Sequence, residues 1–246
     1  MTDQQTRAPF PVALSHLKSV QGWLLWRWVE KPNKPGEFTK PPFQPRNPDR
    51  NASNRNPAHW TDFAAASAAR KAGKADGLGF VVSASQREVW VDLDDCRNPE
   101  TGGLAEWAER YVRMAASYTE VTPSGRGIRI VGVLTGSQSA TPIHKPYRLP
   151  GGGRGEVFYR ADRYVTITGK RLDGTPDELR PIDETVSLLL SEAVSVKSGQ
   201  GESRDLIPAV GEDDDDPVMA LDDRPPLNLS GAVSYTHLTL PTILLV

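Results

Sequence analysis

Asp92 and Asp94, two aspartates separated by one residue, are the side chains of this 246-residue chain best suited to chemistry. They lie near the end of the segment 87–95, REVWVDLDD, in which valine and leucine alternate with Trp90 and the two acids. That alternation predicts a β-strand with both carboxylates on one face, their Cβ atoms about 6–7 Å apart. Like charges so close together repel each other, and a divalent cation between them would remove the repulsion. The pair therefore predicts a metal site, unless the strand simply runs out into an acidic, solvated loop.

A turn of small residues further along the chain could contact phosphates. It consists of Ser124, Gly125, Arg126 and Gly127, and Arg129 follows it on the next expected strand. Such turns expose backbone N–H groups, but the segment matches neither a Walker A loop nor GxGxxG. Taken alone, the segment is better explained as an ordinary hairpin turn than as a phosphate site.

The composition is that of a globular protein, with 38% hydrophobic and 24% charged residues. A single cysteine, Cys96, excludes an internal disulfide and suits a reducing cytosol, so we expect a cytoplasmic protein. We see no signal peptide and no apolar run long enough to cross a membrane. Residues 211–246 hold seven acids and one base, which leaves 28 Lys and Arg against 24 Asp and Glu in residues 1–210. This mildly basic body is compatible with a polyanionic partner.

The expected elements alternate between strands and helices. Helices are predicted over 62–72, capped by Thr61, over 104–116 and over 181–194, and strands over 77–83, 89–94, 118–122, 128–133, 155–159 and 164–169. The first two strands are expected to form a hairpin. Residues 31–58 predict a long loop, and 135–153 a polar excursion.

Trp23, Trp26 and Trp28 crowd the segment before this loop. We interpret them as core residues. The alternative is a binding surface for single-stranded nucleic acid, because the loop adds Lys34, Lys40, Arg46, Arg50 and Arg55.

The two ends of the chain are set apart from this body. Residues 1–21 are interpreted as an N-terminal arm and 22–195 as one domain. Residues 196–232 predict an acidic flexible linker. The abruptly apolar 233–246, VSYTHLTLPTILLV, resembles translated adaptor sequence, so we expect an extraneous tail and a longer natural protein.

The motifs together resemble a known family. In order they are GLGFVV, WVDLDDCRNPETG, SYTEVTPSGRGIRI, GEVFY and RYVTITG. This series is similar to the N-terminal primase-polymerase domain of phage- and plasmid-encoded replication proteins, in the archaeo-eukaryotic primase superfamily. The resemblance runs from about Gly22 to Leu190 and implies an α/β (α+β) fold: an RRM-like sheet with flanking helices and an N-terminal αβ module.

The resemblance also implies roles for individual residues. Asp92 and Asp94 match the paired acids of the first motif, and Glu156 matches the single acid of the third. These three would be catalytic ligands of two Mg²⁺ or Mn²⁺ ions, which prefer oxygen donors. The second motif usually carries a histidine that binds the nucleotide's phosphates. Here the position holds Arg129, which can bind phosphate but cannot titrate. Lys40 and Arg154 are secondary candidates for template or phosphate contacts, or ordinary surface bases.

The expected activity is template-directed nucleotidyl transfer, as a DNA primase or DNA polymerase, in replication of a phage or plasmid-like element. The expected partners are a single-stranded DNA template, nucleoside triphosphates and a helicase domain or protein absent from this chain. Two alternatives stay open. One is a non-catalytic module that binds single-stranded or origin DNA, and the other is a metal-dependent nuclease.

Overall fold

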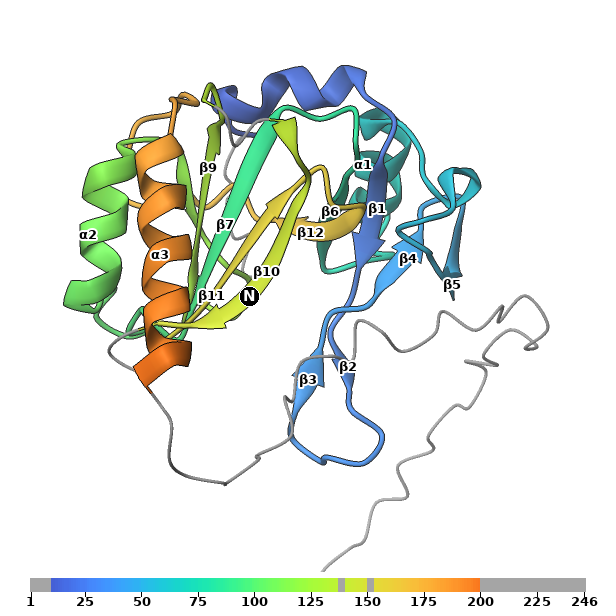
Figure 1. The fold of residues 1–246 in the computed structure, drawn as a ribbon. Coiled ribbons are helices and arrows are strands. Elements are labelled where there is room, and N and C mark those ends of the chain that lie inside the picture. The colour runs from blue at the N-terminus through green and yellow to red at the C-terminus, as the bar shows by residue number, and fades with distance from the viewer. Residues whose placement is uncertain (1–9, 137–139, 150–152, 200–246) are drawn as a thin grey trace, which may run out of the picture.

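Two five-stranded antiparallel sheets organise the computed structural model, which describes residues 10–136, 140–149 and 153–199 (Figure 1). Their strand orders are β10-β11-β7-β9-β8 and β12-β6-β1-β4-β5, and β2 pairs with β3 in a separate two-stranded sheet. Helices pack against both larger sheets. The expected α+β class is therefore confirmed.

The first sheet, which we call the acidic sheet, contains the residues predicted to do chemistry. Its strands are β7 (Glu88–Asp94), β8 (Thr119–Val121), β9 (Ile128–Val133), β10 (Ile143–Arg148) and β11 (Arg154–Tyr159). The period-two pattern of β7 points Val89, Val91 and Leu93 toward α2 (Glu106–Ala115) and α3 (Asp183–Gly199), where all three are fully buried. These helices cover one face of the sheet (Figure 1), so the acids lie on the other.

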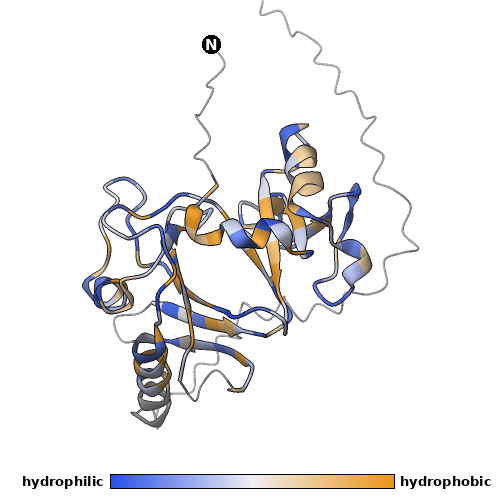
Figure 2. Cartoon of the chain, turned by 90° about the horizontal axis from the view of Figure 1, so that it is seen from above, coloured by the Kyte–Doolittle hydropathy of each residue, from blue (hydrophilic) through white to orange (hydrophobic). Residues whose placement is uncertain are grey.

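The second sheet, the N-terminal sheet, packs against part of that other face. Its strands are β1 (Trp23–Trp26), β4 (Pro42–Gln44), β5 (Asn47–Asn51), β6 (Gly77–Val82) and β12 (Arg163–Ile167). Trp90 and Phe158 of the acidic sheet share one core cluster with Trp23, Phe80 and Val165 of this sheet. In Figure 2 hydrophobic stretches are concentrated on strands in the interior of the molecule, and the outer loops are mostly hydrophilic. The charged residues of the acidic sheet therefore lie next to the packed interface between the two sheets.

The expected hairpin of residues 77–83 with 89–94 is wrong. Strand β6 pairs with β1 and β12 in the N-terminal sheet, whereas β7 pairs with β11 and β9 in the acidic sheet. The residues of β6 are buried along the whole strand. A strand covered on both faces lacks the alternation that would show which sheet it joins.

The segment 31–58 is also more regular than the expected loop. It contains β3 (Phe38–Thr39), β4, β5 and the 3-10 helix η2 (Pro57–His59), and β3 pairs with β2 (Val29–Glu30). Strand β10 likewise lies inside the expected excursion 135–153. These strands are short and rich in polar residues and proline, so their sequences resemble loops.

The folded body extends further in both directions than expected. Residues 12–19, assigned to an N-terminal arm, form the 3-10 helix η1 (Val12–Ser19), in which Leu14 and Leu17 are fully buried. Helix α3 continues to Gly199, past the expected start of the linker at 196. The rest of the predicted linker and the tail 233–246 lie outside the described residues. Helix α1 (Phe63–Lys71) is capped by Asp62, whose Oδ1 accepts from Ala65 N at 2.8 Å, and not by Thr61.

In the part of the chain that the structure describes, no helix is both long and apolar enough to cross a membrane.

Candidate active site

Four charged residues form one line across the acidic sheet, which we call the charged row. In the strand register Glu156 of β11 lies opposite Asp92 of β7, Asp92 lies opposite Arg129 of β9, and Arg129 lies opposite Glu120 of β8. Directly opposed residues of antiparallel strands share a face and lie about 4.5–5.5 Å apart at Cβ. The register thus brings together Asp92, Glu156 and Arg129, three residues predicted from sequence, and adds Glu120, which was not predicted.

The centre of the row is a two-point ion pair. Arg129 Nε donates to Asp92 Oδ1 at 2.5 Å, and Nη2 donates to Asp92 Oδ2 at 2.7 Å. Arg129 Nη1 also donates to the Thr166 carbonyl and, at 3.1 Å, to the Thr166 hydroxyl. Burial alone would lower the pKa of Arg129, but the Asp92 carboxylate outweighs it and raises that pKa. The guanidinium is therefore a fixed positive charge that holds both oxygens of Asp92.

Glu120 lies next to Arg129 on the strand opposite to that of Asp92. It is completely buried, and its Oε1 lies 4.0 Å from Arg129 Nη1. Its oxygens accept hydrogen bonds from Thr168 N at 3.1 Å, Gly169 N at 3.0 Å and the Tyr118 hydroxyl at 2.9 Å. Burial raises its pKa, against the lowering effect of Arg129 and of these donors. A signal was present in the sequence, because Glu120 is an acid in a strand that faces Arg129 across the 123–127 turn.

Asp94 lies two residues beyond Asp92 on the same face, and its surroundings differ. Within the described residues it makes no hydrogen bond or ion pair, and its side chain is exposed at the strand end. Desolvation by neighbouring groups and the nearby charge of Asp92 raise its pKa, while Arg154 and Lys40 act in the opposite direction. Asp94 is thus the carboxylate of the pair that is available to a ligand.

Asp95 forms exposed ion pairs with two bases at this end of the sheet. Its backbone has a left-handed φ of 53°, and its carboxylate lies 3.8 Å from Arg126 Nε and 3.6 Å from Arg154 Nη2. Arg154 lies opposite Asp94 in the register. Two predicted phosphate contacts, Arg126 and Arg154, therefore converge beside Asp94 through a residue that the sequence interpretation did not single out.

Glu156 has partners of its own. Its Oε1 lies 2.8 Å from His144 Nε2 and 4.0 Å from Arg163 Nη2. The His144 ring stacks on Phe158, with ring centroids 5.6 Å apart. Neither His144 nor Arg163 was predicted, because β10 and β12 come next to this position only through the tertiary fold.

Lys40 is the predicted base that the fold brings to the site from furthest away in the sequence. It follows β3, and its half-buried ammonium lies over the Trp28 ring, 5.0 Å from the centroid. Burial and Arg129 lower the pKa of Lys40, while Asp94 and Asp92 raise it. The same three side chains of the acidic sheet thus act on Lys40 electrostatically.

The turn between β8 and β9 is a closed hairpin turn. Gly125 N donates to Thr122 O at 2.9 Å, and Arg126 N lies 3.3 Å from the Ser124 hydroxyl. Gly127 allows close packing on β7, because a Cβ at this position would lie 2.7 Å from Leu93 O. Two of the N–H groups suggested for phosphate binding are thus already engaged, and the Arg126 side chain remains at the rim.

The three predicted metal ligands are adjacent, but their side chains do not converge. Among the described residues no group of three or more His, Cys, Asp or Glu side chains has a metal-binding arrangement. Asp92 turns to Arg129, and Glu156 turns to His144. The oxygen donors suit Mg²⁺ or Mn²⁺, and the mutual repulsion of Asp92 and Asp94 favours a cation. The donor chemistry therefore suits such ions, whereas the observed side-chain positions do not gather the three carboxylates.

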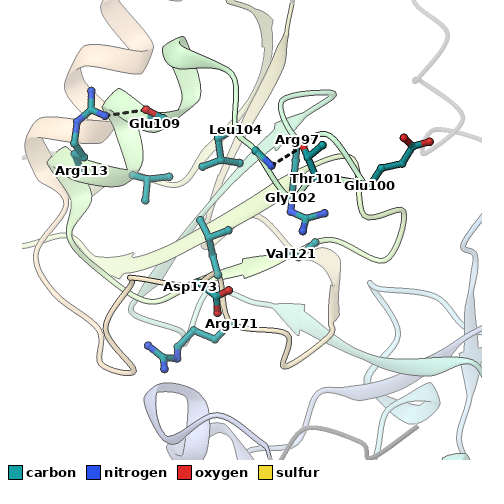
Figure 3. Close-up of a pocket in the computed structure, with 13 residues that line it drawn as sticks. Arg97, Glu100, Thr101, Gly102, Leu104, Glu109, Arg113, Val121, Arg171 and Asp173 are labelled. Atoms are coloured by element: carbon teal, nitrogen blue, oxygen red, sulfur yellow. Dashed lines mark hydrogen bonds and ion pairs between the residues drawn. The ribbon is translucent and has the colours of Figure 1, made fainter.

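A cavity of about 550 Å³ lies elsewhere, where α2, the 97–104 loop, β8 and the 171–173 segment meet (Figure 3). Its charged lining is balanced, with Arg97, Arg113 and Arg171 against Glu100, Glu109 and Asp173. None of the charged row lines it. Arg97 Nη1 donates to Gly125 O at 2.9 Å, so this side chain supports the turn from outside the acidic face.

Comparison with known proteins agrees with the motifs. No protein-family model matches the chain. A curated relative, the DNA primase-polymerase of Nitratiruptor phage NrS-1, is 33% identical over 174 residues, which is 71% of this chain and 22% of that protein. The chain thus spans about a fifth of the length of the relative it matches. The family resemblance is confirmed: 174 residues of the chain are related to a phage protein that is named a DNA primase-polymerase.

Proposed function

We propose that this domain performs template-directed nucleotidyl transfer, as a DNA primase or DNA polymerase, with two divalent metal ions. The observation that supports this most directly is the position of three carboxylates. Glu156 lies opposite Asp92, and Asp94 follows on the same face of the same strand. The relationship to a phage protein named DNA primase-polymerase points to the same reaction class.

Asp92, Asp94 and Glu156 would hold the Mg²⁺ or Mn²⁺ ions. When bound, these ions would lower the pKa of a primer 3′-hydroxyl and neutralise charge on the triphosphate. Arg126 and Arg154, held together by Asp95 at the end of β7, would orient the phosphates.

The remaining cations would complete this arrangement. Lys40 would approach the phosphates from the N-terminal side of the site, and Arg129 would exchange Asp92 for a phosphate oxygen. Ser124, Gly125 and Gly127 would shape the turn that carries Arg126.

The proposed partners are a single-stranded DNA template and nucleoside triphosphates, with a helicase domain or protein acting on the same DNA. The proposed setting is replication of a phage or plasmid-like element in the bacterial cytoplasm.

The test is nucleotide incorporation on a single-stranded template. All eight nucleotides are supplied with Mg²⁺ or Mn²⁺, with and without a primer, and the wild type is compared with Asp92→Asn/Asp94→Asn. We expect metal-dependent product from the wild type and none from the double variant, which should still bind DNA. Equal product from both proteins would refute the proposed site.

A second function, a non-catalytic DNA-binding module, is favoured by one observation. Arg129 holds both oxygens of Asp92, which removes this carboxylate from metal binding. Metal-independent DNA binding without incorporation by well-folded protein would support this alternative. A nuclease would instead shorten labelled DNA in the presence of metal, without any need for nucleoside triphosphates.

A further inference from the structure

The hairpin of β2 and β3 extends from strands β1 and β4 of the N-terminal sheet (Figure 1). Within the described part of the chain its strands pair only with each other, Val29 opposite Thr39 and Glu30 opposite Phe38. Alternation places Glu30 and Phe38 on one face, together with the flanking Trp28 and Lys40. The observed contact of Lys40 with the Trp28 ring agrees with this placement. We call the face that carries Trp28, Phe38 and Lys40 the hairpin face.

Two aromatic rings on this face are exposed to solvent. The exposed fraction is 38% for Trp28 and 55% for Phe38. The other two tryptophans of the 23–28 segment, Trp23 and Trp26, are buried as expected for core residues, so the core interpretation is wrong for Trp28. Glu30, the acid on the same face, turns its carboxylate to the hairpin tip, where it accepts from Gly36 N at 2.6 Å. The face therefore presents the Phe38 ring, the exposed part of the Trp28 ring, which also contacts Trp26 and Lys40, and the lysine itself. Its carboxylate is used to shape the turn.

The charge of the hairpin suits a polyanion. Residues 27–40 contain four bases, Arg27, Lys31, Lys34 and Lys40, against two acids, Glu30 and Glu37. At the tip, Lys31 and Lys34 lie 3.5 Å and 3.9 Å from Glu37. These two lysines share the single negative charge of Glu37. Lys40 has no acidic partner within the described residues. It is therefore the base best placed to contact a ligand on the face.

The hairpin face leads into the candidate active site. Lys40 contacts Trp28 on one side, and on the other its ammonium is influenced by Asp92, Asp94 and Arg129. A nucleic-acid strand lying along Trp28 would thus pass Lys40 before it reaches Asp92 and Asp94. Phe38 lies further out on the same face.

We propose that Trp28 and Phe38 form a stacking platform for the bases of single-stranded nucleic acid, with Lys40 as a phosphate contact between the platform and the acids. The choice of ligand rests on the proposed function. Aromatic side chains beside a basic path bind single strands because every base has a π-face. Each stacked ring contributes to affinity without selecting a sequence.

The experiment measures binding of a fluorescently labelled oligodeoxythymidylate by anisotropy, in EDTA and at fixed salt. The variants are Trp28→Ala and Phe38→Ala, with Trp28→Phe and Phe38→Tyr as conservative partners. Met114→Ala is the matched control, because Met114 is an apolar side chain, 41% exposed, on α2 across the sheet. We expect each alanine variant on the hairpin to weaken binding by about tenfold. The conservative variants and the control should stay within about twofold.

Several outcomes would overturn the platform. One is unchanged DNA affinity in both alanine variants. Another is equal weakening by Met114→Ala, which would indicate a general effect on the fold. A third is unchanged DNA binding together with loss of self-association in sedimentation, which would assign the face to a second copy of the chain. Phe38→Ala keeps the test valid if Trp28→Ala unfolds, because Phe38 is the more exposed ring.

The readout separates this proposal from the proposed function. Binding in EDTA needs neither metal nor nucleotide, so the platform can be tested even if the wild type incorporates nothing. Conversely, if incorporation requires Asp92 and Asp94 while the alanine variants bind DNA normally, the reaction stands and the platform is rejected.

Discussion

Arg129 holds both carboxylate oxygens of Asp92 from the directly opposite position on the neighbouring strand, at 2.5 Å and 2.7 Å. The two aspartates of the motif are therefore not equivalent. Asp92 is neutralised by a buried guanidinium, whereas Asp94, two residues on, makes no ion pair within the described residues. Because of this asymmetry, we expect neutralisation of the two side chains to change the stability of the fold in opposite directions.

Removal of Arg129 should destabilise the fold strongly. Arg129→Gln leaves Glu120 completely buried without its counter-charge and also leaves Asp92 unpaired. Removing one partner of a buried pair typically costs about 3–5 kcal/mol of unfolding free energy. Adding Glu120→Gln removes the unpaired buried negative charge, so the double variant should be more stable than Arg129→Gln alone. Urea unfolding of the wild type, the two single variants and the double variant gives the coupling free energy, and strictly additive effects would contradict the pairing.

Neutralising Asp94 should stabilise the protein, and neutralising Asp92 should destabilise it. The pKa of Asp94 is raised in the folded state, so its ionised form opposes folding at neutral pH. Because the side chain is exposed, we expect Asp94→Asn to add only about 0.5 kcal/mol of stability. Asp92→Asn should instead remove about 1–3 kcal/mol by weakening the bonds to Arg129. Thermal unfolding without metal ions compares the two, and a lower midpoint for Asp94→Asn would contradict the first expectation.

The period-two pattern of residues 87–95 was sufficient to predict the face shared by Asp92 and Asp94. It could not show that Arg129 would bind both carboxylate oxygens of Asp92, because this contact depends on the register between β7 and β9. Glu120 was missed for the same reason. His144 was missed because it lies in a segment that has the composition of a loop.

The larger error in the fold concerned strand partners. Short sequence separation between β6 and β7 favours a hairpin, yet β6 is buried on both faces and belongs to the other sheet. Which sheet a fully buried strand joins depends on distant segments such as β1 and β12, and local periodicity carries no information on that choice.

Gly127 should be the glycine of the turn that tolerates substitution least. A Cβ there would lie 2.7 Å from Leu93 O and 3.3 Å from Asp94 Cα, so Gly127→Ala must push the turn away from β7. Overpacking of this kind costs about 1–3 kcal/mol. Gly103→Ala is the matched control, because its nearest contact would be Thr101 Oγ1 at 3.4 Å. Chemical denaturation of both variants tests the prediction, and equal loss of stability would contradict a specific contact between the turn and β7.

Asp183 should make the stability of the domain depend on pH. Its carboxylate accepts from Gly136 N at 2.7 Å and from Thr135 N at 3.0 Å and 3.1 Å, which joins the start of α3 to the segment after β9. Burial opposes ionisation of Asp183, but these N–H groups outweigh it and lower its pKa below the ordinary value of 3.8.

A lowered pKa in the folded state stabilises the protein above the unfolded-state pKa, and this contribution is lost as the pH falls through the folded-state pKa. Asp183→Asn should therefore reduce stability by about 1 kcal/mol at pH 7. The difference from the wild type should shrink as the pH is lowered through about 4 toward 3. Thermal unfolding of both proteins over this range measures it, with Asp173→Asn as an exposed control. A difference that stays constant with pH would show that the carboxylate charge plays no part.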